Sequence, residues 1–254
     1  MVTFSHDGPG TDEQLWRQLG GLDKLKPLEG QVPQNIVILA AHPDDETLGA
    51  GGLMAHVAAS GAQVDVVVAT AGEASHPHSP TLAPQQLAGL RAREVRAAVR
   101  TLAPDARLHV LGLPDGRLVD HVSQLAEILR GLLTEGCWLV APWRRDAHPD
   151  HEAAGHAAAS ALSTGIRLLE YPVWLWHWAE PGDERVPWAR LRSLRLSADE
   201  RRAKVEAMSA HVSQVRPLSP QPGDEALLGP GVLAHFERDI EVFFVDEGST
   251  GERA

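Results

Sequence analysis

Short apolar runs alternate with segments of helical periodicity along most of the chain, and this alternation constrains the fold more than any other feature. The runs lie at residues 36–41, 64–69, 107–111 and 138–141. The helical patterns lie at residues 48–59, 85–102, 119–133 and 152–162. Strands that are apolar throughout are buried on both faces, as in a parallel sheet covered by helices on both sides. The sequence therefore predicts an α/β protein with a mostly parallel, Rossmann-like sheet.

The rest of the chain is predicted to extend the same sheet. A fifth strand is expected at residues 168–173 and a last strand at 241–245. Ser197 and Glu200 have the spacing of a capping box, which predicts a helix from there to about His211. No internal repeat or linker interrupts the pattern, so residues 1–254 are expected to form a single domain.

The two ends of the chain are predicted to lie outside this core. Residues 1–34 are polar and rich in turns, and we expect a peripheral N-terminal arm with one short helix. Thr11 or Asp12 would cap that helix, and three apolar side chains would face inward: Leu15, Trp16 and Leu19. Residues 246–254 are expected to be a flexible tail.

Composition excludes several classes of function. Acidic residues number 34 against 23 basic ones, and the net charge of −11 argues against nucleic acid as a partner. The single cysteine, Cys137, excludes an internal disulfide and a Cys-rich zinc site. No apolar run reaches the ~18 residues of a membrane span, and no secretory signal is evident, so a cytoplasmic protein is expected. The 13 histidines prompt a search for a metal site.

The segment His42-Pro43-Asp44-Asp45-Glu46 directly follows the first apolar run. Ligands bind beyond the carboxyl ends of strands in open α/β sheets, so this turn is well placed for a site. His42 and Asp45 are three residues apart and offer a nitrogen and an oxygen that zinc accepts. Three successive carboxylates repel one another unless a cation neutralises them. The alternative is an acidic helix N-terminus stabilised by the helix dipole.

A second segment, residues 146–151 (DAHPDH), follows the fourth apolar run and repeats this plan. His148 is followed by proline and an acid, and His151 comes three residues after it. His151 would complete a set of three ligands with His42 and Asp45. Three protein ligands leave a metal an open position, as catalytic sites do. The alternative, a pair of solvated loop histidines, is disfavoured because the same arrangement occurs twice.

These two segments resemble the motifs of the LmbE/PIG-L family of zinc-dependent N-deacetylases. Further family-like stretches follow in the same order, at residues 70–73 (TAGE), 91–94 (RARE), 113–116 (LPDG) and 204–214. The resemblance spans roughly residues 35–215. It implies an LmbE-like fold, and it leaves residues 174–188 without a matching motif.

The resemblance also implies roles for individual residues. Three of them would bind Zn²⁺, with Fe²⁺ or another divalent metal left open: His42, Asp45 and His151. Asp44 would be the general base, and His148 would polarise the substrate carbonyl and hold the oxyanion. Asp150 would orient His148. These roles suit hydrolysis, because a metal lowers the pKa of water and a nearby carboxylate can accept its proton.

Three further residues would bind the substrate if the resemblance holds: Arg91, Asp115 and Glu73. Asp115 matches an acid that hydrogen-bonds sugar hydroxyls, and Glu73 matches another residue lining the pocket. Arg91 would contact the substrate or shape the site. The alternatives are simple turn residues for Asp115 and Glu73, and an i,i+3 surface ion pair between Arg91 and Glu94.

Other motifs carry less weight. The glycines at residues 49–52 lack the G-x-G-x-x-G pattern, and carboxylates occupy the turn where a phosphate would lie, so nucleotide binding is not expected. His76 and His78 are interpreted as part of a mobile loop. The alternating Trp174, Trp176 and Trp178 would form a half-buried edge or pocket wall, with core packing favoured.

The residues alone predict hydrolysis at a single metal ion, and the resemblance implies that the protein removes the acetyl group from an N-acetylated amino sugar. The resemblance implies an N-acetylglucosaminyl conjugate, hence a small-molecule substrate, and leaves homo-oligomers open. Two alternatives stay open. Two histidines with one carboxylate also match the facial triad of Fe(II) oxygenases. A non-catalytic sugar-binding protein could also have kept the metal site.

Overall fold

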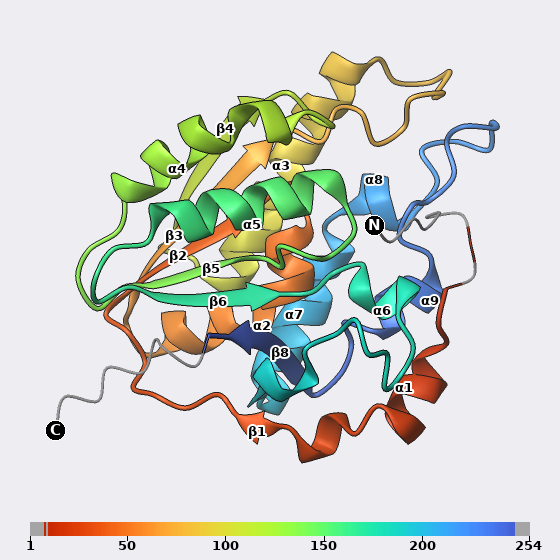
Figure 1. The fold of residues 1–254 in the computed structure, drawn as a ribbon. Helices are drawn as coiled ribbons and strands as arrows, with labels where there is room; N and C mark the ends of the chain where they lie inside the picture. Colours follow the sequence, from red (N-terminus) through yellow and green to blue (C-terminus); the bar gives the residue numbers. More distant parts are fainter. Residues whose placement is uncertain (1–7, 9, 247–254) are drawn as a thin grey trace, which may run out of the picture.

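A mixed sheet runs through the middle of the protein (Figure 1). The computed structural model describes residues 8 and 10–246, and within them the sheet has eight strands. In their order across the sheet they are β1 (Lys26–Pro27), β7 (Leu191–Arg195), β8 (Ile240–Val245), β6 (Arg167–Tyr171), β5 (Trp138–Pro142), β2 (Asn35–Ala40), β3 (Gln63–Thr70) and β4 (Arg107–Leu113). Strand β8 is antiparallel to both of its neighbours, and the other pairs are parallel. The predicted mostly parallel α/β fold is confirmed.

Strand β2 and the residue after it show how the apolar runs supply two cores at once. Its side chains alternate between the faces of the sheet, as the period of two requires. One core contains Ile36, Ile38 and Ala40, and the other contains Val37, Leu39 and Ala41. A strand buried on both faces explains why this run is apolar at nearly every position.

Helices cover both faces of the sheet (Figure 1). The first core also holds apolar side chains of α2 (Asp45–Ala59), α3 (Pro84–Leu102) and α7 (Ala198–Ser209). The second core holds those of α4 (Val122–Arg130) and α5 (Pro149–Ala161). Shorter helices are α1 (Glu13–Leu19), α6 (Leu175–Trp178), α8 (Val212–Val215) and α9 (Pro230–Ala234), with 3-10 turns at Leu22–Lys24, Leu118–His121 and Trp188–Arg190. Within the described part of the chain, no helix is both long enough and apolar enough to cross a membrane.

The order of the strands creates a crevice between β2 and β5. From β2 the chain proceeds outward through β3 and β4, whereas from β5 it proceeds the other way to β6. In such sheets the connections diverge at this switch point, and ligands bind outside the carboxyl ends of the strands there. The first His-Pro segment begins two residues after the end of β2, and the second begins four residues after the end of β5.

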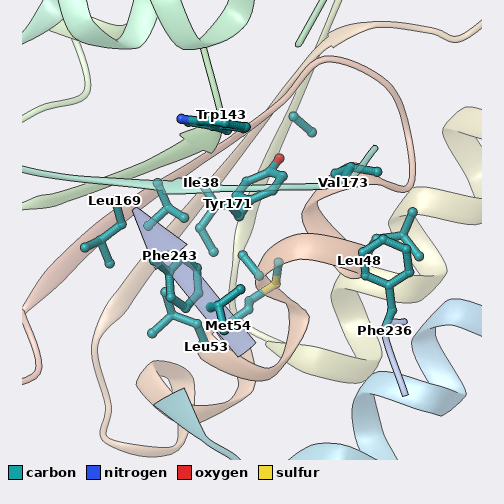
Figure 2. Close-up of a cluster of buried hydrophobic side chains, with 14 of the residues drawn as sticks. Ile38, Leu48, Leu53, Met54, Trp143, Leu169, Tyr171, Val173, Phe236 and Phe243 are labelled. Carbon is teal, nitrogen blue, oxygen red and sulfur yellow. The ribbon is translucent and has the colours of Figure 1, made fainter. Parts of the chain in front are cut away.

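Close packing of α2 against the sheet fixes the start of that helix beside the crevice. Tyr171 lies in a buried cluster with Ile38 and Leu48 (Figure 2), and its hydroxyl donates to the Leu39 carbonyl at 2.7 Å. A Cβ atom at Gly49 would lie 2.0 Å from the Tyr171 ring. Position 49 therefore requires glycine for α2 to approach the sheet this closely.

The N-terminal segment is anchored to the Trp-rich segment by one buried tryptophan. Trp16 of α1 is fully buried, packs edge-on against Trp176 and donates from Nε1 to its carbonyl at 2.9 Å. Asp12 caps α1, as predicted, because its carboxylate accepts from the Gln14 amide. The prediction for Leu19 is wrong: it is the last residue of this two-turn helix and is 66% exposed.

The Trp-rich segment folds as the short helix α6, and Trp174 and Trp176 are buried. Of the two interpretations of this segment, core packing therefore describes it better. The tail predicted at residues 246–254 lies outside the described residues except for Asp246, which pairs with Arg190.

A buried ion pair also ties α1 to the segment before β8. The Glu13 carboxylate accepts from Arg238 Nε at 3.0 Å and lies 2.7 Å from His235 Nδ1. Burial alone would raise the pKa of Glu13, but His235 and Arg238 outweigh it and lower the pKa to about 2. In the unfolded chain the pKa of Glu13 is near 4.5. The stabilisation is therefore complete above about pH 4.5 and is lost as the pH falls toward 2.

Glu13→Gln should lower the free energy of unfolding at pH 7 by ~3 kcal/mol, because it leaves a buried guanidinium without its counter-charge. Urea unfolding should show a smaller deficit at pH 3, where wild-type Glu13 is already partly protonated in the unfolded chain. Asp239→Asn is the control: it removes an exposed ion pair with Arg195 and should cost under ~1 kcal/mol. Equal deficits at both pH values would contradict the assignment.

Candidate active site

The two His-Pro segments meet at the carboxyl ends of β2 and β5. The ring centres of His42 and His148 are 4.9 Å apart, and those of His148 and His151 are 4.6 Å apart. The His42 and His151 rings, which come from different segments, are separated by 5.4 Å. Topology thus brings side chains more than a hundred residues apart in sequence to one place.

Both loops adopt strained backbone conformations. Among the described residues, the non-glycine positions with positive φ are Asp44, at 149°, and Ala147, at 67°. Asp44 is two residues after His42, and Ala147 directly precedes His148. Strain of this kind costs of order 1–3 kcal/mol and persists where the surrounding structure enforces it, often at functional sites.

Backbone amides of the first loop hold the Asp45 carboxylate in place. One carboxylate oxygen, Oδ2, accepts from the amides of Ala41 at 3.0 Å and His42 at 2.8 Å. The other oxygen, Oδ1, lies 3.2 Å from Nε2 of His151. The carboxylate therefore bridges the two loops with one oxygen fixed and the other directed at the second imidazole.

The second loop is organised by Asp146, a fully buried residue that sequence reasoning did not assign to the site. Its carboxylate lies 2.8 Å from Nδ1 of His151 and accepts from the amides of Val173, Trp174 and Leu175. Asp146 thus leaves only Nε2 of His151 facing the first loop. The sequence signal that could have identified Asp146 is an acid in the same loop as the histidines, but its spacing from His151 fits no regular pattern.

The donors around the first loop fit a divalent cation. Nε2 of His151 is buried and has no hydrogen-bond partner among the described residues, although Asp45 lies close to it. Nδ1 of His42 lies 3.6 Å from the Asp45 carboxylate. A buried imidazole nitrogen without a partner is costly, and a cation bound between these groups would satisfy it. His42, His148 and His151 also form a cluster with closely spaced ligand atoms, as do His42, Asp115 and Asp150.

The charges of this cluster also favour a cation. Burial opposes ionisation of Asp45, but His151 and His42 outweigh it and hold its pKa well below the usual range. Burial likewise opposes protonation of the imidazoles, but Asp45 and Asp146 raise the pKa of His151 to about 9. Asp115 and Asp150 hold the pKa of His42 well above its usual value. Protons on the imidazoles thus supply positive charge that a bound cation would replace.

Asp44 lies beside this group and is held by Arg91. The Arg91 Nη2 atom donates to the Asp44 carboxylate at 3.2 Å and to the Pro43 carbonyl at 2.9 Å. Burial raises the pKa of Asp44 to about 6, with Arg91 acting in the opposite direction. Arg91 is 2% exposed and also donates to the Gly72 carbonyl. Two roles were predicted for Arg91, and these contacts fit a role in shaping the site better than a role in binding the substrate.

The alternative of a surface ion pair between Arg91 and Glu94 is wrong. Both side chains are buried, and the Glu94 carboxylate accepts from the amide and hydroxyl of Ser213. The helix α3 therefore uses these two residues to hold the first loop and the start of α8.

Asp150 acts on both histidines, but differently from what the resemblance implies. Its carboxylate lies 3.2 Å from His42 Nε2 and accepts from the amides of Gly116 and Leu118. Its link to His148 is the backbone amide, which donates to His148 Nδ1 at 3.2 Å. The reason is geometric: His148 is the N-cap of α5, so its side chain folds over the first turn.

Asp115 and Glu73 also join the site through hydrogen bonds within the protein. One oxygen of Asp115 lies 3.1 Å from His42 Nε2, and the other accepts from the Ala74 amide at 2.8 Å. Glu73 accepts from the Asp115 amide at 3.0 Å and is not among the residues that line the cavity over the site. Its carboxylate is turned toward the loop of Asp115, so the predicted substrate contact by Glu73 has no support in this arrangement.

A cavity of about 1020 Å³ opens over the cluster. The predicted site residues that line it are His42, Asp44, Asp45, Arg91, Asp115, His148 and His151. The cavity lining thus combines the candidate metal ligands with the Asp44 carboxylate and the His148 imidazole. The volume of the cavity is at the upper end of the range for small-molecule sites.

Comparisons with known proteins show what this chain is similar to. The family model described as "PIG-L: GlcNAc-PI de-N-acetylase" matches residues 37–162, which include both His-Pro segments. A 1D-myo-inositol 2-acetamido-2-deoxy-alpha-D-glucopyranoside deacetylase from Mycobacterium sp. (strain JLS) is 25% identical, over 89% of this chain and 88% of the relative.

Two solved structures share the fold. The conserved protein TT1542 from Thermus thermophilus is 27% identical with a TM-score of 0.60, over 86% of this chain and 99% of that one. The N,N'-diacetylchitobiose deacetylase from Pyrococcus horikoshii has a TM-score of 0.57 at 20% identity, over 81% and 80%. The resemblance seen in the sequence is confirmed: the chain contains a PIG-L (LmbE) family domain over residues 37–162.

Proposed function

We propose that this protein is a zinc-dependent N-deacetylase that hydrolyses the acetamido group of an N-acetylglucosaminyl conjugate. The observation that carries the proposal is one cavity lined by three candidate ligands together with Asp44 and His148. The family model and the Mycobacterium relative are both named for deacetylation of acetylated glucosamine derivatives, which supports the same reaction here.

His42, Asp45 and His151 are the proposed ligands. Two imidazole nitrogens and one carboxylate oxygen suit Zn²⁺, and Fe²⁺ accepts the same donors. When bound, such a cation lowers the pKa of water and polarises a carbonyl oxygen. Asp146 and Asp150 hold the two imidazoles from behind, an arrangement that fixes the orientation of ligand histidines.

Asp44 is the proposed general base. It lies at the cavity floor, and Arg91 fixes its carboxylate. As water adds to the acetamido carbonyl, a C–O bond forms and Asp44 accepts the proton that water loses. The C–N bond then breaks, the nitrogen takes up a proton, and acetate and the free amine are released. A positioned base of this kind contributes ~10²–10⁴-fold in rate.

His148 is proposed to stabilise the oxyanion. Its Nδ1 atom accepts from the Asp150 amide, so in the neutral ring the proton sits on Nε2. Donation from that N–H to the carbonyl oxygen would stabilise the negative charge that develops there. The same imidazole, once protonated, could supply the proton to the departing nitrogen.

The two alternative functions predict different products. An Fe(II) oxygenase would consume O₂, and a non-catalytic sugar-binding protein would bind ligand without releasing acetate. Acetate release under nitrogen from N-acetylglucosaminides by the zinc-loaded protein is the test. Release without O₂ would exclude both alternatives, and its absence with bound zinc and sugar would overturn the proposed function.

His151→Ala should abolish zinc binding, whereas Asp146→Asn should weaken it ~10–100-fold, because Asp146 only orients the ligand. Chelator competition measures both zinc affinities, and circular dichroism checks that each variant is folded. His56→Ala is the matched control, since His56 is a partly exposed histidine paired with Glu200. Unchanged zinc affinity in His151→Ala would remove this residue from the ligand set.

Asp44→Asn should keep one equivalent of zinc while acetate release falls ~10²–10⁴-fold, because the amide cannot accept the proton of water. Elemental analysis and an acetate assay give the two readouts. Asp199→Asn, at an exposed carboxylate paired with Arg202, should leave both unchanged. Loss of zinc from Asp44→Asn would make Asp44 a ligand, and full turnover would exclude it as the base.

A further inference from the structure

The cavity extends well beyond the groups assigned to the reaction. Its outer wall consists of two segments, residues 74–78 after β3 and residues 223–232 leading into α9. Neither segment contains a proposed ligand or the proposed base. We refer to these two segments as the outer wall. If the acetamido group lies at the cavity floor, the group attached to the sugar must face this wall.

The outer wall is held in place by Asp224. Its carboxylate accepts from the hydroxyls of Ser79 and Ser219, each at 2.5 Å, and also from that of Thr81. Ser79 and Thr81 follow the first segment in sequence, whereas Asp224 lies in the second. Two of these hydroxyl donors, Ser79 and Thr81, therefore join the two segments through one buried carboxylate.

Further contacts make the outer wall a preformed surface. His76 is buried, and its Nε2 atom lies 3.0 Å from the Glu225 carbonyl oxygen. Gly223 has a φ of +92°, and a Cβ atom there would lie 2.5 Å from the His78 carbonyl oxygen. The second segment, which the sequence did not place, thus packs against the two histidines that the sequence interpretation assigned to a mobile loop.

Apolar residues contribute a large part of the cavity lining. The apolar residues that line the cavity include Leu48, Val173, Trp174, Leu227, Leu228 and Val232. They come from α2, from the turn before α6 and from the outer wall. Such a surface gains free energy by covering an apolar group, and Trp174 adds an aromatic side chain.

The described lining of the cavity offers an anion no free guanidinium or ammonium group. Among the described residues that line it, Arg91 is the one Arg or Lys, and its guanidinium already donates to two carbonyls and to Asp44. The lining also includes carboxylates at the floor and Glu225 in the outer wall. Recognition of a phosphate or carboxylate usually needs a free guanidinium, ammonium or cluster of amides, and the described lining offers no free Arg or Lys for it.

We infer that the group attached to the acetylated sugar is uncharged and presents an apolar face to the outer wall, with Leu227 among the residues it contacts. This inference rests on the proposed function, since it takes the acetamido group to lie at the floor. It separates neutral glycosides from sugars linked to a phosphate or a carboxylate, a distinction that the reaction chemistry itself does not make.

Three α-linked N-acetylglucosaminides test the inference: the methyl, phenyl and 4-carboxyphenyl glycosides. Calorimetry with zinc-loaded Asp44→Asn protein at pH 8 measures binding without turnover. The phenyl glycoside should bind at least ~10-fold more tightly than the methyl glycoside, and the 4-carboxyphenyl glycoside at least ~10-fold more weakly than the phenyl one. Binding of the carboxylate as tight as that of the phenyl compound would overturn the inference.

Leu227→Arg places a cation in the outer wall and should improve binding of the 4-carboxyphenyl glycoside ~10-fold while leaving the methyl glycoside unchanged. Leu227→Gln is the matched neutral control and should give no improvement for the carboxylate. Equal effects of the two variants would remove Leu227 from the surface that contacts this group.

The same three glycosides, assayed for acetate with wild-type protein, separate failure of the inference from failure of the proposed function. Acetate release from all three with a reversed order of affinity would overturn the inference alone. The expected order of affinity without any acetate release would overturn the proposed function and retain a site for neutral apolar glycosides.

Discussion

A buried carboxylate shared between two imidazoles is the interaction on which the rest of this site depends. One carboxylate oxygen of Asp45 accepts hydrogen bonds from backbone amides of its own loop, and the other oxygen faces His151. Leaving such a group without positive charge costs several kcal/mol, so the site must hold protons or a cation. The strained backbone at Asp44 and Ala147 is maintained around this group. This part of the protein is thus able to bind a metal ion in place of those protons.

The fold provides this interaction through the order of its strands and the packing of one helix. Strands β2 and β5 are neighbours, although about a hundred residues separate them, and their connections leave in opposite directions. Gly49 allows α2 to approach Tyr171, which places the first turn of that helix over the crevice. Asp146 then joins the second loop to the Trp-rich segment through three backbone amides. The site is therefore supported by rigid elements on each side.

The sequence predicted much of this because the strong signals are local. Apolar runs and helical periods identified the strands of the parallel core, and two His-Pro segments located the site. The contacts of Asp146, Arg91 and Asp150 could not be predicted, since each depends on backbone groups brought near by tertiary structure. Leu19 was misplaced because α1 ends at this residue, beyond the turn that Trp16 anchors. The outer wall was missed because its segments carry no motif and are held by hydroxyl groups common in any loop.

The most direct test of the metal centre is anomalous diffraction from zinc-loaded crystals. We predict one zinc ion bound by His42, Asp45 and His151 at ~2.0–2.2 Å, with an open position toward the cavity and Asp44 outside ligand distance. An ion bound by His148 in place of Asp45, or by His42 with Asp115 and Asp150, would contradict this ligand set.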